Sequence, residues 1–162
     1  MGLLSDQVDK KEIEVITREL RRVLTNKVIG DVVEFGCYLG TTSVYIADIL
    51  KNSGREFYAY DSFEGLPEKT DEDISPLGES FKAGELFASK KQFIKNMLSA
   101  RVPLPHVVKG WFSDLTTKDV PDKIAFAFLD GDYYRSVADP IKLISNRLQN
   151  GATVIVDDYA NP

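Results

Sequence analysis

The sequence contains one cysteine, Cys37, and one histidine, His106, among its 162 residues. A single thiol can form neither a disulfide within the chain nor a thiolate zinc site, which favours a reducing, cytoplasmic compartment. A single imidazole excludes histidine-rich metal sites and any Ser-His-Asp triad that does not use His106. No apolar run reaches the roughly 20 residues of a membrane-spanning helix, so no membrane partner is expected.

Positive charge is also scarce, because 20 Lys and Arg residues face 25 Asp and Glu residues, for a formal net charge of −5. Without a cluster of Lys or Arg the chain cannot neutralise a phosphate backbone, so no nucleic-acid partner is expected. A hydrophobic fraction of 43% with 28% charged residues is ordinary globular composition. We expect one domain over residues 1–162, with an N-terminal helical segment (1–29) and a core (30–159).

Short apolar, β-branched runs alternate with helical patterns along the chain. Five strands are expected, at residues 32–35, 57–60, 107–108, 124–129 and 152–156. Helices are expected at residues 8–24, 44–50, 84–99 and 141–148, the second of them capped by Thr41, Thr42 or Ser43. Several strands are continuously apolar, as in a sheet that helices cover on both faces. The predicted fold is therefore α/β, with a doubly wound, Rossmann-like parallel sheet.

Residues 62–83 show no periodicity and separate the second strand from the next helix. A loop of this length inside a compact domain is usually functional or disordered. We interpret it as a candidate lid over a ligand site.

Acidic residues stand at or next to the carboxyl ends of the expected strands: Glu34, Asp61, Asp130, Asp157 and Asp158. Polar residues often end strands simply because the chain reaches the surface there. Three carboxylates about 5 Å apart, however, repel one another by roughly 3 kcal/mol per pair at an effective dielectric constant of 20. A bound cation would relieve this repulsion. Oxygen ligands without His or Cys favour Mg²⁺, followed by Ca²⁺ or Mn²⁺.

The loop after the first strand, residues 34–40, has glycines that permit a tight turn before a helix. A dinucleotide fingerprint requires G-x-G-x-x-G, whereas Cys37, Tyr38 and Leu39 fill the middle of this loop. The loop therefore suits a positively charged cofactor better than a pyrophosphate. Asp61, at the end of the second strand, can accept hydrogen bonds from ribose hydroxyls, as acidic residues do in nucleoside-binding α/β folds.

Five segments in this order resemble the macrocin O-methyltransferase family. They are the Glu-x-Gly-x-x-x-Gly loop, Asp61–Pro67 (DSFEGLP), Lys109–Asp114 (KGWFSD), Leu129–Tyr134 (LDGDYY) and Val154–Tyr159 (VIVDDY). The resemblance implies a class I methyltransferase fold that uses S-adenosylmethionine and Mg²⁺. It also implies methyl transfer to a hydroxyl of a small acceptor, such as a sugar of a secondary metabolite.

The resemblance further implies a role for individual residues. The cofactor set would be Glu34, Gly36 and Tyr38 along the methionine and ribose, Thr42 or Ser43 near the carboxylate, Asp61 and Ser62 at the ribose, and Trp111 to Ser113 at the adenine. The metal ligands would be Asp130, Asp157 and Asp158, and Asp130 would also act as the general base.

The family carries a sixth and a seventh strand, which these 162 residues do not contain. A non-catalytic or truncated S-adenosylmethionine-binding module is therefore the alternative to an active enzyme. A nicotinamide-dependent oxidoreductase is a further alternative, disfavoured by the filled glycine loop. The sequence leaves open whether the protein forms a homo-oligomer.

Overall fold

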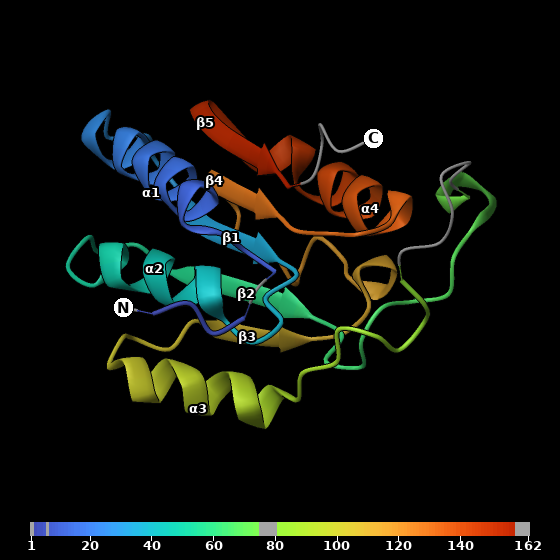
Figure 1. Cartoon of the computed structure of the whole chain (residues 1–162). Helices are drawn as coiled ribbons and strands as arrows, with labels where there is room; N and C mark the ends of the chain where they lie inside the picture. The colour runs from blue at the N-terminus through green and yellow to red at the C-terminus, as the bar shows by residue number, and fades with distance from the viewer. Residues whose placement is uncertain (1, 6, 75–80, 158–162) are drawn as a thin grey trace.

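A computed structural model of the protein describes residues 2–5, 7–74 and 81–157. Five strands are described: β1 (Asp31–Phe35), β2 (Phe57–Asp61), β3 (His106–Lys109), β4 (Ile124–Leu129) and β5 (Leu148–Val156). They form one parallel sheet in the order β3-β2-β1-β4-β5 (Figure 1). The predicted five-stranded, doubly wound sheet is thus confirmed, and its strand order reverses between β1 and β4.

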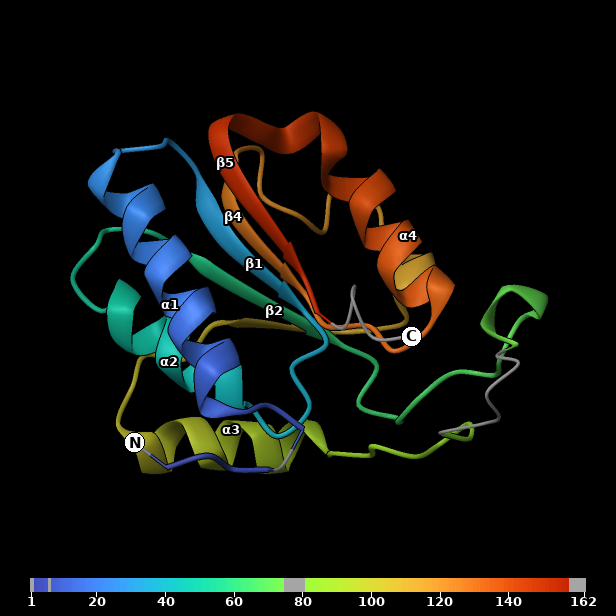
Figure 2. The same cartoon turned by 45° about the horizontal axis from the view of Figure 1, so that its top comes forward.

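Helices cover both faces of this sheet (Figure 2). One face carries α1 (Lys10–Thr25), α2 (Thr41–Leu50) and α3 (Lys90–Ala100), and the other carries α4 (Tyr134–Ile144). Short 3₁₀ turns lie at η1 (Asp71–Asp73), η2 (Phe112–Asp114) and η3 (Ser145–Arg147). Among the described residues, no helix is long and apolar enough to cross a membrane.

The core has two apolar layers because adjacent residues of a strand point to opposite faces. Val32 packs with Leu20 and Ile46 on the side of α1 and α2. Its neighbour Val33 packs with Leu129 and Ile144 on the side of α4. Burial on both faces explains the continuous apolar runs of the strands.

Three predicted helix starts are wrong. Gly40, not Thr41 to Ser43, is the N-cap of α2, and the three hydroxyl residues are buried inside its first turn. Helix α3 begins at Lys90 rather than residue 84, because Ser89 caps it by accepting a hydrogen bond from the Gln92 N–H. Helix α4 begins at Tyr134 rather than residue 141 and runs through Pro140.

The last strand is longer than predicted. The sequence predicts a strand over 152–156, but β5 begins at Leu148, inside the predicted helix 141–148, and runs through Asn150 and Gly151 to Val156. Gly151 has a left-handed backbone (φ 85°), and the pairing of β5 with β4 shifts register between Ile124 and Phe126. Asn and Gly are typical turn residues, so the sequence alone does not predict that the strand includes them.

Candidate functional site

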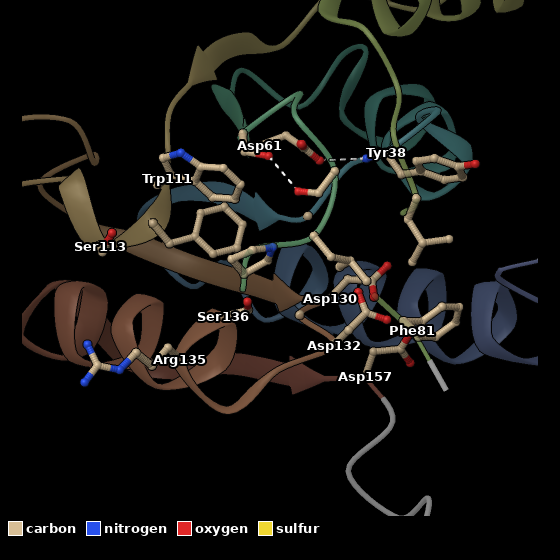
Figure 3. A pocket seen from close by; sticks show the side chains of 18 of the residues that line it. Tyr38, Asp61, Phe81, Trp111, Ser113, Asp130, Asp132, Arg135, Ser136 and Asp157 are labelled. Carbon is tan, nitrogen blue, oxygen red and sulfur yellow. Dashed lines mark hydrogen bonds between the residues drawn. The ribbon is translucent and has the colours of Figure 1, made fainter. Parts of the chain in front are cut away.

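A cavity of about 220 Å³ lies beyond the carboxyl ends of the strands, at the point where the strand order reverses (Figure 3). Ligands of open α/β sheets bind at such a place. The lining residues at or after the strand ends are Gly36, Tyr38, Asp61, Ser62, Gly110, Trp111, Phe112, Ser113, Asp130, Gly131, Asp132 and Asp157. Gln7, Gly65, Leu66, Pro67, Phe81, Leu86, Arg135 and Ser136 complete it.

The parallel hydrogen-bond ladder continues past the strand ends and fixes the acidic residues there. The Asp130 N–H donates to the Phe35 carbonyl (2.8 Å), and the Asp157 N–H donates to the Leu129 carbonyl (2.9 Å). Both aspartates therefore leave neighbouring strands at the same level and line one cavity. Their carboxylates, with that of Asp132, gather on one side of it (Figure 3).

Gly36 allows β1 and β4 to approach each other at the cavity floor. Its φ is +87°, and a Cβ atom there would lie 2.0 Å from the carbonyl oxygen of Asp130. No side chain fits at that distance, so the first glycine of the predicted loop is a steric requirement of the site.

Asp61 organises the glycine loop. Its Oδ2 accepts hydrogen bonds from the Cys37 and Tyr38 N–H groups, each at 2.9 Å. Its Oδ1 accepts one from the Phe63 N–H at 2.7 Å. Tyr38 has a left-handed backbone (φ 43°), which is costly for a residue with a side chain. The Asp61 carboxylate thus stabilises a strained loop while it also lines the cavity.

Glu34, Thr42 and Ser43, predicted to contact the cofactor, are buried and do not line the cavity. The Glu34 side chain lies beneath the loop, where its Oε2 accepts a hydrogen bond from the Ser43 hydroxyl and its Oε1 has no partner. Burial, with a contribution from the negative charge of Asp61, raises the pKa of Glu34 to about 8. The structure therefore gives Glu34 a place under the site, and its contact with a cofactor stays a prediction.

The aromatic wall of the cavity comes from the segment after β3. Trp111, Phe112 and Ser113 all line it, and their contact with an adenine, which the resemblance implies, stays a prediction. The Phe112 ring stands edge-on to Phe35, with centroids 5.4 Å apart and planes at 88°. Phe112 is thereby held by the core, and the wall can stack against a flat ligand.

Several lining residues had no signal in the sequence. Gln7 belongs to the N-terminal segment, which is tied to α2 by a hydrogen bond from the Leu4 N–H to Thr41 Oγ1 (3.3 Å). Leu86 lies in a segment predicted as helix, and Arg135 lies before the predicted start of α4. Correct helix boundaries would have placed these last two near the site.

Of the candidate lid (62–83), Ser62, Gly65, Leu66, Pro67 and Phe81 line the cavity. Residues 75–80 lie outside the described part of the chain. Closure of the loop over a ligand therefore stays a prediction.

The carboxylates of the cavity set the kind of ligand that it suits. The described lining includes Asp61, Asp130, Asp132 and Asp157, whereas Arg135 is the basic residue among them and points away from the carboxylates (Figure 3). An acidic cavity disfavours the pyrophosphate of a dinucleotide and attracts a cation. A sulfonium and an ammonium group, both present in S-adenosylmethionine, fit this charge.

The predicted metal ligands are described only in part. Asp130 and Asp157 line the same cavity, while Asp158 lies outside the described residues. Within the described residues, no group of three or more His, Cys, Asp or Glu side chains is arranged to hold a metal ion. The hard carboxylate oxygens of Asp130 and Asp157 are of the kind that Mg²⁺ prefers, and a metal site that they share with Asp158 stays a prediction.

The five-stranded parallel sheet is Rossmann-like, of the class I methyltransferase type, and solved structures agree. The structure of the O-methyltransferase NovP has a TM-score of 0.79 and 27% identity, covering 93% of this chain and 66% of that one. The calicheamicin methyltransferase CalS11, at 18% identity and a TM-score of 0.76, supports the fold alone.

The chain belongs to the macrocin-O-methyltransferase (TylF) family, whose model matches residues 6–162. It is 30% identical, over 94% of its length, to 8-demethyl-8-(2,3-dimethoxy-alpha-L-rhamnosyl)-tetracenomycin-C 4'-O-methyltransferase of Streptomyces olivaceus. It is 28% identical, over 92% of its length, to demethyldecarbamoylnovobiocin O-methyltransferase of Streptomyces niveus. The chain spans 62% and 60% of the lengths of these two relatives. The resemblance predicted from the sequence motifs is confirmed.

Proposed function

We propose that the cavity binds S-adenosylmethionine and that the protein transfers its methyl group to a hydroxyl of a small glycosylated molecule. The acidic cavity at the β1/β4 switch point is the observation that carries this proposal. The name of the Streptomyces olivaceus relative, a 4'-O-methyltransferase of a rhamnosyl-tetracenomycin, supports the acceptor class. The predicted cytoplasmic location stays a prediction.

Within this proposal, different residues of the cavity bind different parts of the cofactor. Asp61, Ser62 and Tyr38 would hold the ribose and methionine parts of the cofactor, and Trp111 to Ser113 would border the adenine. When bound, S-adenosylmethionine supplies a methyl group activated by a positively charged sulfur. Fixing both reactants in line can contribute about 7 to 11 kcal/mol to lowering the barrier.

Asp130 is the proposed general base. Its carboxylate would accept the proton of the acceptor hydroxyl as the new C–O bond forms and the C–S bond to the methyl group breaks, with the neutral thioether leaving, because an alcohol is a poor nucleophile while it keeps that proton. Asp130, Asp157 and Asp158 are the proposed Mg²⁺ ligands. When bound, the ion lowers the pKa of a coordinated hydroxyl.

Methyl transfer is tested directly by incubating the protein with S-adenosylmethionine, MgCl₂ and a rhamnoside of an aromatic alcohol. The expected result is a product heavier by one methylene unit, whose formation EDTA suppresses and added Mg²⁺ restores. Binding of S-adenosylmethionine without turnover of any hydroxylated glycoside would instead support the non-catalytic binding module. Turnover that EDTA leaves unchanged would overturn the role of Mg²⁺.

A further inference from the structure

The loop after β2 is attached to the opposite wall of the cavity by the side chain of Asp73. Asp73 Oδ1 accepts a hydrogen bond from the Tyr134 N–H at 2.7 Å, across 61 residues of sequence. Tyr134 is the first residue of α4, whose N-cap residue, Tyr133, provides no side-chain cap. A helix N-terminus needs acceptors for its free N–H groups and favours a negative charge. Asp73 supplies both from a distant segment.

The same carboxylate also fixes its own turn. Asp73 Oδ2 accepts hydrogen bonds from the N–H and the hydroxyl of Thr70, each at 2.8 Å. Burial acts to raise the pKa of Asp73, but the hydrogen bonds from Thr70 and the Tyr134 N–H outweigh it and lower the pKa. The carboxylate that caps α4 is therefore fixed on both oxygens, with Oδ2 bonded to Thr70 and Oδ1 bonded to the Tyr134 N–H.

Two further contacts join the loop to Tyr133. The Tyr133 hydroxyl donates a hydrogen bond to the Phe81 carbonyl (3.3 Å), and Lys69 Nζ lies 5.7 Å from the centroid of the Tyr133 ring. The Tyr133 side chain is buried, with 7% of its surface exposed. The loop thus contacts both residues at the start of α4, and these contacts come from either side of residues 75–80.

The base of the loop is closed independently of Asp73. The Leu66 N–H donates to the Glu85 carbonyl and the Gly84 N–H donates to the Leu66 carbonyl, each at 2.9 Å. Gly65 permits this pairing, because a Cβ atom there would lie 2.6 Å from the Gly84 carbonyl oxygen. Loss of the contact at Asp73 would therefore release the far part of the loop and leave its base in place.

We infer that Asp73 is a positioning residue that fastens the loop to α4 and thereby holds the part of the cavity lined by Arg135 and Ser136, in the first turn of that helix. Asp61 and Trp111 line the cavity from other segments, at the end of β2 and after β3. On the proposed function, on which this assignment rests, the part held by Asp73 receives the acceptor. Asp73 itself does not line the cavity, so it acts through the start of α4.

The test compares Asp73→Ala with Asp71→Ala in the full chain. Asp71 lies in the same 3₁₀ turn, is exposed, and carries the same charge. Hydrogen–deuterium exchange is expected to become at least ten-fold faster in Asp73→Ala at residues 134–137 and 67–74, and to stay unchanged in β1 and α1. Asp73→Asn should restore part of the protection of residues 134–137, because its amide oxygen can still accept from the Tyr134 N–H. Asp71→Ala should match the unmodified protein throughout.

Kinetics supply the second readout. In Asp73→Ala the acceptor KM is expected to rise at least ten-fold, with kcat changed less than three-fold and the affinity for S-adenosylmethionine changed less than two-fold. Equal exchange in Asp73→Ala and Asp71→Ala would overturn the assignment, and so would faster exchange across the whole chain with loss of cofactor binding. Absence of turnover in the unmodified protein would count against the proposed function alone, because the exchange result would still decide the role of Asp73.

Discussion

Glu34 keeps a carboxyl group wholly out of contact with water, at the end of a central strand. Its pKa of about 8, raised chiefly by burial from 4.5, means that the folded protein retains a proton that the unfolded chain releases between these two values. The free energy of unfolding must therefore fall as the pH rises through that window, by at most about 1.4 kcal/mol per pH unit.

Glu34→Gln should remove this pH dependence, because the amide is neutral at every pH. The free energy of unfolding, measured by urea denaturation at pH 5, 6.5 and 8, is expected to decline for the unmodified protein and to stay nearly level for the variant. The exposed Glu14→Gln on α1 serves as the control and should decline like the unmodified protein. A parallel decline in Glu34→Gln would mean that another group titrates.

Asp61 combines two tasks in one carboxylate, since it holds the Cys37 and Tyr38 N–H groups and faces the cavity. Asp61→Ala is expected to weaken S-adenosylmethionine binding by about 1.5 to 3 kcal/mol, from the loss of hydrogen bonds to a charged group. Calorimetric titration measures this, with Asp48→Ala, an exposed position on α2, as the control. An unchanged dissociation constant in Asp61→Ala would remove Asp61 from the site.

At the scale of the elements, the carboxyl ends of β1 and β4 can lie close together only because Gly36 has no side chain. Gly36→Ala would bring a methyl group against the Asp130 carbonyl oxygen, so the strand ends must separate. We expect a loss of at least about 2 kcal/mol in the free energy of unfolding, together with loss of cofactor binding. Gly54→Ala separates crowding from backbone strain, because Gly54 also has a positive φ (+71°) but nothing within 4 Å of its Cβ position.

Gly54→Ala should cost only about 1 to 2 kcal/mol, the penalty of a left-handed backbone with a side chain. It should also leave the affinity for S-adenosylmethionine unchanged. Equal losses of stability and binding in both variants would show that crowding at the β1/β4 junction is not what makes Gly36 necessary.

The strands β1, β2 and β4 were predictable because each is a short apolar run with an acidic residue at or next to its end, and β4 was predicted with its true limits, Ile124 to Leu129. Helix limits were less accessible. Helix α4 starts at Tyr134 rather than at residue 141, and the carboxylate that caps it comes from Asp73, far away in the sequence. Long-range capping of this kind leaves no local pattern.

The same division applies to the site. Asp61, Asp130 and Asp157 were predictable because the ends of parallel strands meet at one edge, whereas Trp111 was predicted only through the resemblance to the family. Gln7 and Phe81 were not, because they reach the cavity from loops whose course depends on tertiary contacts. The burial of Glu34 beneath its loop was also not predictable, because the sequence shows that the residue is acidic but not how far it is buried.

At the scale of the molecule, the chain has a net charge of −5, and several of its acidic residues line the cavity. We predict that Asp157→Ala abolishes Mg²⁺ binding while leaving the affinity for S-adenosylmethionine within about three-fold, because Asp157 lies on the carboxylate side of the cavity, away from Asp61 and Trp111 (Figure 3). Titration with MgCl₂ in the presence and absence of cofactor measures both effects, and Asp48→Ala again provides the control. Equal loss of metal and cofactor would contradict two separate subsites.

The central claim is that the acidic cavity at the strand-order reversal accepts a cationic nucleoside cofactor. Calorimetric titration of the unmodified chain with S-adenosylmethionine, and in parallel with NAD⁺, tests it most directly. We predict saturable binding of one S-adenosylmethionine per chain and no measurable heat from NAD⁺. Saturable binding of NAD⁺ with none of S-adenosylmethionine would contradict the claim.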